Sequence, residues 1–253
     1  MMRIFTSKRF AQCLVVAACA YMLKLYYSTA SADELRWILA PTTAVVELIT
    51  GVRFVFEPHA GYMNPDRSFL IASACAGVNF LITALLMLSI KRLVVDRRRE
   101  TRWIYLPFAL SVAFLTTLIA NATRIIIAMQ IGQSSSENTW LRSNEFHRFE
   151  GIIVYFAFLL LLFVLTDDYN TERYGAWRYL IPLVVYYGMT LVVPFVNGVN
   201  VGRGFLEHST YVLLVPLIVV VPVASIMLIR GRLTTSETSR FRRFAPVGTE
   251  RKV

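Results

Sequence analysis

Long apolar runs separated by short polar segments make up most of this chain. A helix needs about 20 mainly apolar residues to cross the hydrocarbon core of a bilayer. Six runs approach or exceed that length and each predicts a transmembrane helix: 10–27, 69–90, 103–132, 151–166, 179–196 and 211–229. The hydropathy pattern therefore predicts a helical protein that crosses the membrane several times.

A seventh apolar segment, 37–56, contains a proline, a glycine and two charges, and the basic residues decide how it is placed. Most of the 26 basic residues fall into three groups, at 3–9, 91–102 and 230–252. Cytoplasmic loops of membrane proteins carry an excess of Lys and Arg, so all three groups are predicted to be cytoplasmic. A crossing by 37–56 would put the middle group outside. We therefore predict that 37–56 is a re-entrant or interfacial helix on the outer side.

The predicted fold class is all-α: a polytopic integral membrane protein with about six transmembrane helices plus one re-entrant or interfacial helix. Residues 1–230 are expected to form a single transmembrane domain, and the basic tail at 231–253 is expected to be disordered in the cytoplasm. The N-terminal run also fits a signal peptide cleaved after Ala30-Ser31-Ala32, but its near-spanning length and bulky end favour a retained helix. Both termini are then cytoplasmic, and the outer loops are 28–68, 133–148 and 197–210.

Composition supports the membrane assignment and excludes several classes of function. Hydrophobic residues make up 56% of the chain and charged residues only 17%, against about 25% charged in soluble domains. A water-soluble enzyme and a disordered chain are both excluded. The net charge of +10 is explained by the cytoplasmic loops, so we expect no nucleic-acid partner. The three cysteines form no disulfide framework, the three histidines show no metal-ligand spacing, and we expect no cofactor.

The predicted topology brings three reactive residue types to the outer face of the membrane. Cys75 lies among small residues near the outer end of the second run, with Asn79 one turn further in on the same face. Arg124 is the one charge in the third run, and Asn121 precedes it by three residues. The residues from 103 to 123 span roughly 31 Å as a helix, so Arg124 should reach the outer boundary. His147 directly precedes the fourth run.

A thiol, an imidazole and a guanidinium suit acyl transfer. The imidazole can accept the thiol proton and later protonate a leaving amine, and the cation can stabilise the oxyanion. Each residue also has a simpler interpretation: Cys75 as a packing residue, Arg124 as a snorkelling side chain and His147 as an interfacial residue. Arg148 and Glu150 are interpreted as solvated charges at a helix end.

Three motifs around these residues resemble those of the exosortase/archaeosortase family. The motifs are Ala74-Cys75-Ala76-Gly77-Val78-Asn79-Phe80, Asn121-Ala122-Thr123-Arg124-Ile125 and His147-Arg148-Phe149-Glu150-Gly151. Their order, spacing and membrane side match the family over roughly residues 30 to 170. The form of the cysteine motif looks most like the exosortase K branch, because many other branches have serine where this chain has Ala76.

The resemblance implies a cysteine protease or transpeptidase in the cytoplasmic (inner) membrane of a bacterium, with its active site on the extracytoplasmic side. Its partners would be membrane-anchored proteins that carry a C-terminal sorting signal. Cys75 would be the nucleophile, His147 the acid and base, and Arg124 the group that stabilises substrate or oxyanion. Asn79 and Asn121 would support them. No oligomeric state is predicted.

Two other functions stay open at the level of the sequence. A transporter or channel component would use Arg124 to bind an anionic substrate. An assembly factor would carry out no chemistry, and substitutions in it would act only through folding. A thiol redox role is excluded because Cys13 and Cys75 are predicted at opposite sides of the membrane.

Overall fold

The computed structural model describes residues 7–95, 102–134, 144–166, 180–196, 209–218, 220 and 222, with the backbone alone at 94–95, 132–134, 144–148 and 195–196. The helices are α1 (Ser7–Thr29), α2 (Arg36–Thr50), α3 (Val78–Ile90), α4 (Tyr105–Ser134), α5 (Asn144–Leu165), α6 (Ile181–Tyr187) and α7 (Val193–Val196). The strands are β1 (Val55–Glu57), β2 (Gly61–Met63) and β3 (Leu70–Ile71). The tail at 231–253, His208 and most of the loop at 197–210 lie outside the described residues.

Within the described residues, three helical stretches are long and apolar enough to cross a membrane: Ser7–Thr29, Ser73–Leu93 and Tyr105–Ile131. The second stretch combines α3 with the short helical turns on either side of it. Shorter apolar helices cover Phe149–Leu165, Ile181–Val192 and Ser209–Ile218. Each of the six overlaps one of the predicted runs. The helical membrane architecture is confirmed at that level, and the number of six crossings stays a prediction.

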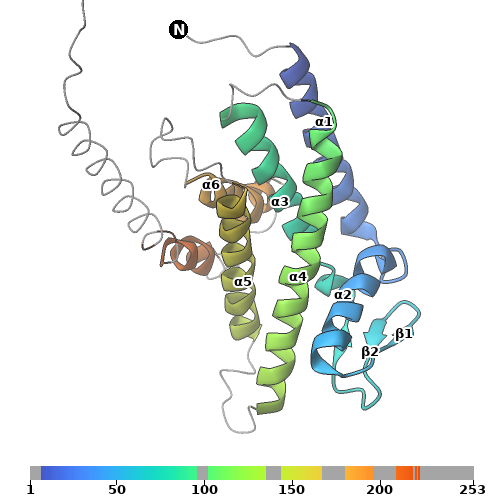
Figure 1. Ribbon diagram of the computed structural model, residues 1–253. Helices are drawn as coiled ribbons and strands as arrows, with labels where there is room; N and C mark the ends of the chain where they lie inside the picture. The colour runs from blue at the N-terminus through green and yellow to red at the C-terminus, as the bar shows by residue number, and fades with distance from the viewer. Residues whose placement is uncertain are drawn as a thin grey trace, which may run out of the picture.

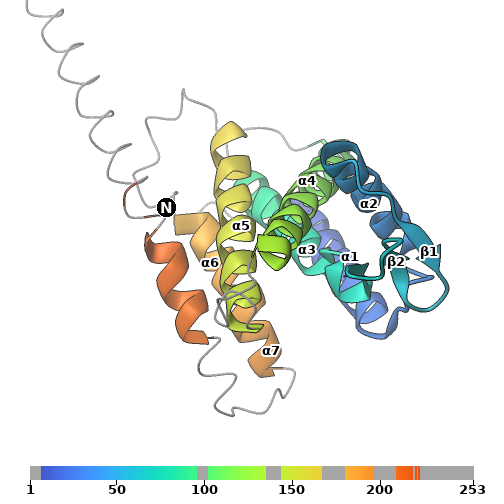
Figure 2. The same ribbon diagram turned by 90° about the horizontal axis from the view of Figure 1, so that it is seen from below.

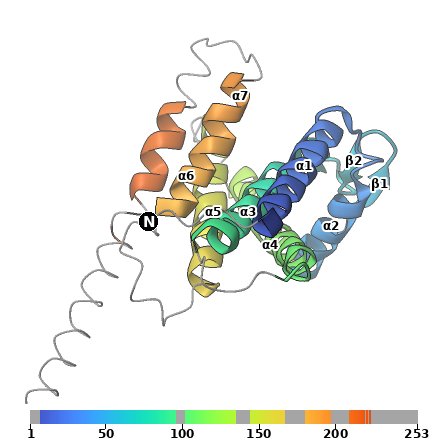
Figure 3. The same cartoon turned by 90° about the horizontal axis from the view of Figure 1, so that it is seen from above.

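Helix α3 forms the centre of the molecule (Figures 1, 2 and 3). It packs against α1, α4, α5 and α6, and nearly all of its side chains are buried. The views along the bundle show α2 and the strands on one side of it and α5, α6 and α7 on the other. The α3 sequence is apolar on all faces, which is typical of a helix surrounded by other helices.

One end of the bundle, which we call the basic end, gathers the start of α1, the end of α3, the start of α4 and the end of α5. The Tyr105 hydroxyl donates a hydrogen bond to the Leu88 carbonyl over 2.9 Å and ties α4 to α3. The Lys91 ammonium donates to the Phe163 carbonyl over 3.2 Å and to the Thr166 hydroxyl over 3.1 Å, which ties α3 to α5. Lys8, the second residue of α1, lies at the same end.

The second predicted run is not one helix, contrary to our expectation. Leu70 and Ile71 belong to β3, residues Ser73–Cys75 form a 3-10 turn, and α3 begins only at Val78. Gly77 separates turn from helix with φ of 70°, a conformation that glycine adopts without steric cost. Hydropathy could not reveal this break, because the residues on both sides of it are equally apolar.

The segment at 37–56 is a helix over only part of its length. α2 ends at Thr50 and is capped by Gly51, and Val55 and Phe56 belong to β1, so the prediction of a helix up to residue 56 was wrong. Fifteen residues give about 22 Å of helix, which is shorter than the hydrocarbon core. α2 packs along α4, with the Trp37 ring stacked on Phe114 at 6.0 Å between centroids.

A small antiparallel sheet follows α2, in the order β1-β2-β3 among the described strands (Figure 1). The all-α prediction did not include it, since strands of two or three residues leave no alternation long enough to detect. The Glu47 carboxylate accepts a hydrogen bond from the Phe54 N–H over 2.6 Å and joins α2 to the segment that enters β1. His59 lies in the turn of this hairpin, where its Nδ1 is 3.0 Å from the Asp33 carboxylate.

Candidate active site

Cys75 lies in the bend before α3, at the end of that helix opposite Lys91. Its N–H donates to the Ala72 carbonyl over 2.8 Å, and its side chain is half-buried. Its carbonyl accepts a hydrogen bond from the side-chain amide of Asn121. The thiol is therefore carried on a turn whose backbone is fixed by α4, a position that differs from the helical one the sequence predicts.

Asn121 connects three elements at this end of the molecule. Its side chain is 0% exposed, and its Nδ2 donates to the backbone of Cys75. Its Oδ1 accepts a hydrogen bond from the Tyr155 hydroxyl over 2.8 Å. The amide thus has a partner on both sides, as a buried polar group requires, and it joins the Cys75 turn, α4 and α5.

Arg124 lies one turn beyond Asn121 on α4 and faces the same tyrosine. Its Nη1 donates to the Tyr155 hydroxyl over 3.2 Å, and its Cζ lies 5.4 Å from the centre of the Tyr155 ring. Arg124 also interacts electrostatically with Cys75 and Glu150. The structure therefore brings the predicted nucleophile and the predicted cation into one cluster, which Tyr155 and Asn121 complete.

Gly151 allows this close approach of Arg124 to α5. A Cβ atom at Gly151 would lie 3.0 Å from Arg124 Nε and 3.4 Å from Cζ, a contact that would force the guanidinium to move. The glycine of the third motif therefore has a physical role: it makes room for the arginine of the second.

Glu150 corrects one expectation. It was interpreted as a solvated charge at a helix end, but its side chain is only 5% exposed and it interacts electrostatically with Arg124. The reason is that the start of α5 packs against α4 at this point rather than facing water. Glu150 is therefore a buried member of the cluster.

His147 lies in the first turn of α5, where the backbone is described and the side chain is not. Positions 147, 151 and 155 are four residues apart, so they share one face of the helix. That face carries Gly151, which contacts Arg124, and Tyr155. The backbone thus places His147 on the cluster's side of α5. Arg148 is described in the same limited way.

Asn79, predicted as a supporting residue, lies on a different side of the site. Its Oδ1 accepts a hydrogen bond from the Lys24 ammonium over 2.8 Å, and that ammonium lies 5.8 Å from the centre of the Tyr27 ring. Tyr27 lies near Cys75 and Tyr155. α1 therefore supplies a cation and an aromatic ring beside the cluster.

Sequence reasoning missed Tyr155, Lys24 and Tyr27. A signal for Tyr155 exists, because it follows Gly151 by four residues and so continues the face that begins at His147. Lys24 was overlooked because it lies near the end of an apolar run, where a charged residue is usually interpreted as marking the end of the membrane-spanning segment. Tyr27 has no sequence signal, since aromatic residues are common at the ends of membrane helices.

Comparison with known proteins identifies the family. A family model described as a transmembrane exosortase matches residues 6–164, which is more than half of the chain. The match covers Cys75, Arg124 and His147. No curated protein and no solved structure gives a match.

Proposed function

The chain belongs to the transmembrane exosortase family, and from this premise we propose that it is a cysteine protease or transpeptidase that removes C-terminal sorting signals from exported proteins. The observation that carries the proposal is the cluster itself. Cys75 and Arg124, far apart in the sequence, are joined through Asn121 and Tyr155 by three hydrogen bonds. A packing cysteine and a snorkelling arginine would not require a buried polar connection.

The proposed reaction begins with proton transfer from the Cys75 thiol to His147. The thiolate sulfur attacks the scissile carbonyl carbon, and the negative charge that develops on its oxygen is stabilised by Arg124. The C–N bond then breaks, and the leaving amine takes the proton from His147. The products of this first half are a thioester on Cys75 and the released C-terminal segment.

The second half resolves the thioester. A nucleophile, either water or an acceptor amine, loses a proton to His147 as it attacks the thioester carbonyl. The C–S bond breaks, and the leaving Cys75 thiolate takes the proton from His147, which re-forms the thiol. Hydrolysis and transfer use the same three residues. The nucleophile that reaches the thioester therefore determines which product forms.

We place the enzyme in the cytoplasmic membrane of a bacterium, with both termini in the cytoplasm and the cluster at the outer face. The basic residues between α3 and α4, predicted to be cytoplasmic, support this orientation, since Cys75 lies at the opposite end of α3. The sequence Cys75-Ala76-Gly77 supports a position near the K branch of the family. Substrates anchored by a C-terminal helix would present their scissile bond at the level of the cluster.

The test compares processing with and without the thiol. Wild type, Cys75→Ala and Cys75→Ser are expressed at matched membrane levels in a strain that lacks the native gene, and the C-termini of envelope proteins are profiled by mass spectrometry. Trimmed C-termini should appear with wild type and with the control variant Cys19→Ala, and should be missing with both Cys75 variants, because Cys19 is an exposed residue of α1 outside the cluster. If a cellular phenotype of wild type persists in both Cys75 variants and is lost in Arg124→Ala, a transporter that uses Arg124 replaces the proposal.

A further inference from the structure

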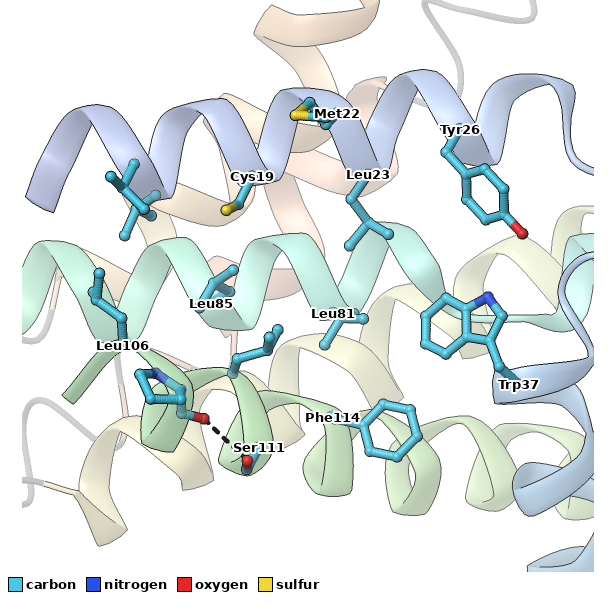
Figure 4. A pocket seen from close by; sticks show the side chains of 14 residues that line it. Cys19, Met22, Leu23, Tyr26, Trp37, Leu81, Leu85, Leu106, Ser111 and Phe114 are labelled. Atoms are coloured by element: carbon cyan, nitrogen blue, oxygen red, sulfur yellow. Dashed lines mark hydrogen bonds between the residues drawn. The ribbon is translucent and has the colours of Figure 1, made fainter. Parts of the chain in front are cut away.

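An apolar groove runs between α1 and α4, away from the cluster, with α3 as its floor (Figure 4). Its volume is about 890 Å³. One wall is formed by Val15, Val16, Cys19, Met22, Leu23 and Tyr26 of α1. The floor is formed by Leu81 and Leu85, and the other wall by α4 between Leu106 and Phe114. Figure 4 shows α1 and α4 on either side of α3, with Trp37 of α2 across one end.

Two polar side chains in this lining, Ser111 and Tyr26, already have partners. The Ser111 hydroxyl donates to the Pro107 carbonyl of its own helix over 3.0 Å. The Tyr26 hydroxyl donates to the Glu34 carbonyl over 2.8 Å. The groove therefore offers contacts to hydrocarbon and has little to offer a polar ligand.

The length of the groove distinguishes between two apolar occupants, a transmembrane helix of a partner protein and the acyl chain of a lipid. The lining residues of α1 extend from Val15 to Tyr26, which is about 17 Å of helix. That is roughly half of a hydrocarbon core of about 30 Å. Beyond this length the stacked rings of Trp37 and Phe114 close the groove, so a partner helix that crosses the whole membrane would meet them. An acyl chain from one leaflet has the matching length.

Charge at the open end indicates which lipid fits. Lys8 precedes Cys19 by eleven residues, which is three helical turns, so it lies on the groove-facing side of α1. Arg102 comes four residues before Leu106, the first lining residue of α4, and both cations are exposed. Neither α1 nor α4 has an acidic residue in its first turn. Trp103, 47% exposed beside Arg102, is typical of a membrane interface.

We propose that the groove between α1 and α4 binds an anionic phospholipid from the leaflet at the basic end, with acyl chains in the groove and the phosphate between Lys8 and Arg102. The acyl chains then fill the space between two helices that share α3 as a floor. The lipid stabilises the position of α1, whose Lys24 and Tyr27 lie beside the cluster. The inference depends on insertion in a membrane and is independent of the proposed peptidase activity.

The test measures lipid retained by the purified full-length protein. The protein is reconstituted in vesicles of equal parts phosphatidylglycerol and phosphatidylcholine, extracted gently and examined by native mass spectrometry. A basic residue near the surface gives about a fivefold preference for anionic lipid, so two give about 25-fold. We expect one retained phosphatidylglycerol per chain, and a preference near one for the double variant Lys8→Gln, Arg102→Gln.

Groove-filling variants test the acyl-chain site separately. Cys19→Trp and Ser111→Phe each place a ring in the groove and should abolish the retention of phosphatidylglycerol. Two variants on different helices are used so that the test does not depend on the folding of either one. Leu14→Trp is the matched control, since Leu14 is 54% exposed and lies on the other side of α1. Arg53→Gln is the control for the loss of a positive charge. Arg53 lies at the end of the molecule that holds the cluster, so this variant should keep the preference for phosphatidylglycerol.

Three results would overturn the proposal: equal retention of the two lipids by wild type, unchanged retention in both groove-filling variants, or a double charge variant that keeps the preference. If the groove-filling variants stop substrate processing while lipid retention is unchanged, the groove holds a helix of a partner protein instead.

Discussion

At the scale of single residues, the cluster depends on one hydroxyl with two partners. The Tyr155 ring is stacked on Phe80, 5.0 Å apart and tilted by 21°, so its position is fixed by packing. Its hydroxyl donates to Asn121 and accepts from Arg124. Tyr155 is therefore a positioning residue: it sets the place of the guanidinium relative to the turn that carries Cys75.

Tyr155→Phe should lower kcat by about 10–100-fold with little change in KM. The ring and its packing remain, and the lost hydrogen bond to a charged group corresponds to about 1.5–3 kcal/mol. The measurement is cleavage of a substrate by the purified enzyme, with thermal unfolding as a check on the fold. Tyr26→Phe is the control, because the Tyr26 hydroxyl bonds to Glu34 outside the cluster. Equal losses in the two variants would mean that Tyr155 has no positioning role.

Gly151→Ala should reduce activity without reducing stability. The new Cβ would meet Arg124 Nε at 3.0 Å and displace the guanidinium, while alanine favours a helix over glycine by about 1 kcal/mol. Because displacing the guanidinium also weakens its hydrogen bond to Tyr155, the gain in helix propensity is offset. Turnover should therefore fall while the midpoint of thermal unfolding changes little. Gly188→Ala is the control, since a Cβ there meets no atom within 4 Å. Full activity in Gly151→Ala would contradict the account of this contact.

At the scale of elements, the junction between the sheet and α3 determines where the thiol is held. Gly77 combines a left-handed backbone with tight packing, because a Cβ there would lie 3.1 Å from Asn121 Cγ and 3.3 Å from Thr117 Cγ2. The turn at Cys75 can contact α4 only because this position has no side chain.

Gly77→Ala should destabilise the protein by about 2–4 kcal/mol, since left-handed strain and overpacking add. Gly51→Ala separates the two causes. Gly51 has φ of 72° with no atom within 4 Å of the added Cβ, so strain alone should cost about 1–2 kcal/mol. The measurement is thermal or denaturant unfolding of both variants beside wild type. Equal destabilisation would show that the contact with α4 contributes nothing.

The elements also show how far sequence reasoning reaches. Long apolar runs locate α1 and α4 to within three residues and the end of α5 to within one, because length and hydropathy are local signals. α5 begins seven residues before its apolar run, inside the predicted outer loop at 133–148, because its first two turns are polar. The break at Gly77, the short strands and the end of α2 at Gly51 depend on backbone conformation and tertiary contact, which hydropathy does not record. For the same reason the sequence points to Cys75, Arg124 and Asn121 and misses Tyr155, whose role exists only where α4 meets α5.

At the scale of the whole molecule, the account requires a defined orientation in the membrane. The basic end and the cluster lie at opposite ends of α3, so one of them faces the cytoplasm. The positive-inside rule assigns the cytoplasm to the basic end. His59, in the hairpin turn beyond α2, should then face outward.

Labelling of intact cells with a membrane-impermeant maleimide checks this orientation. His59→Cys should add labelling above that of wild type, because its side chain is highly exposed and would lie outside. Arg98→Cys, in the basic segment between α3 and α4, should be labelled only after the membrane is permeabilised. The reverse pattern would place the cluster in the cytoplasm and exclude processing of exported proteins.

The central claim is that Cys75 forms a covalent acyl intermediate, and its most direct test is the mass of the enzyme during turnover. The protein is purified under acid quench from cells that process substrate, and peptides containing Cys75 are examined by mass spectrometry. The account predicts an acyl adduct on Cys75 that neutral hydroxylamine removes and that is missing from Cys75→Ala. Continued processing by Cys75→Ala, with no adduct on the wild-type thiol, would contradict it.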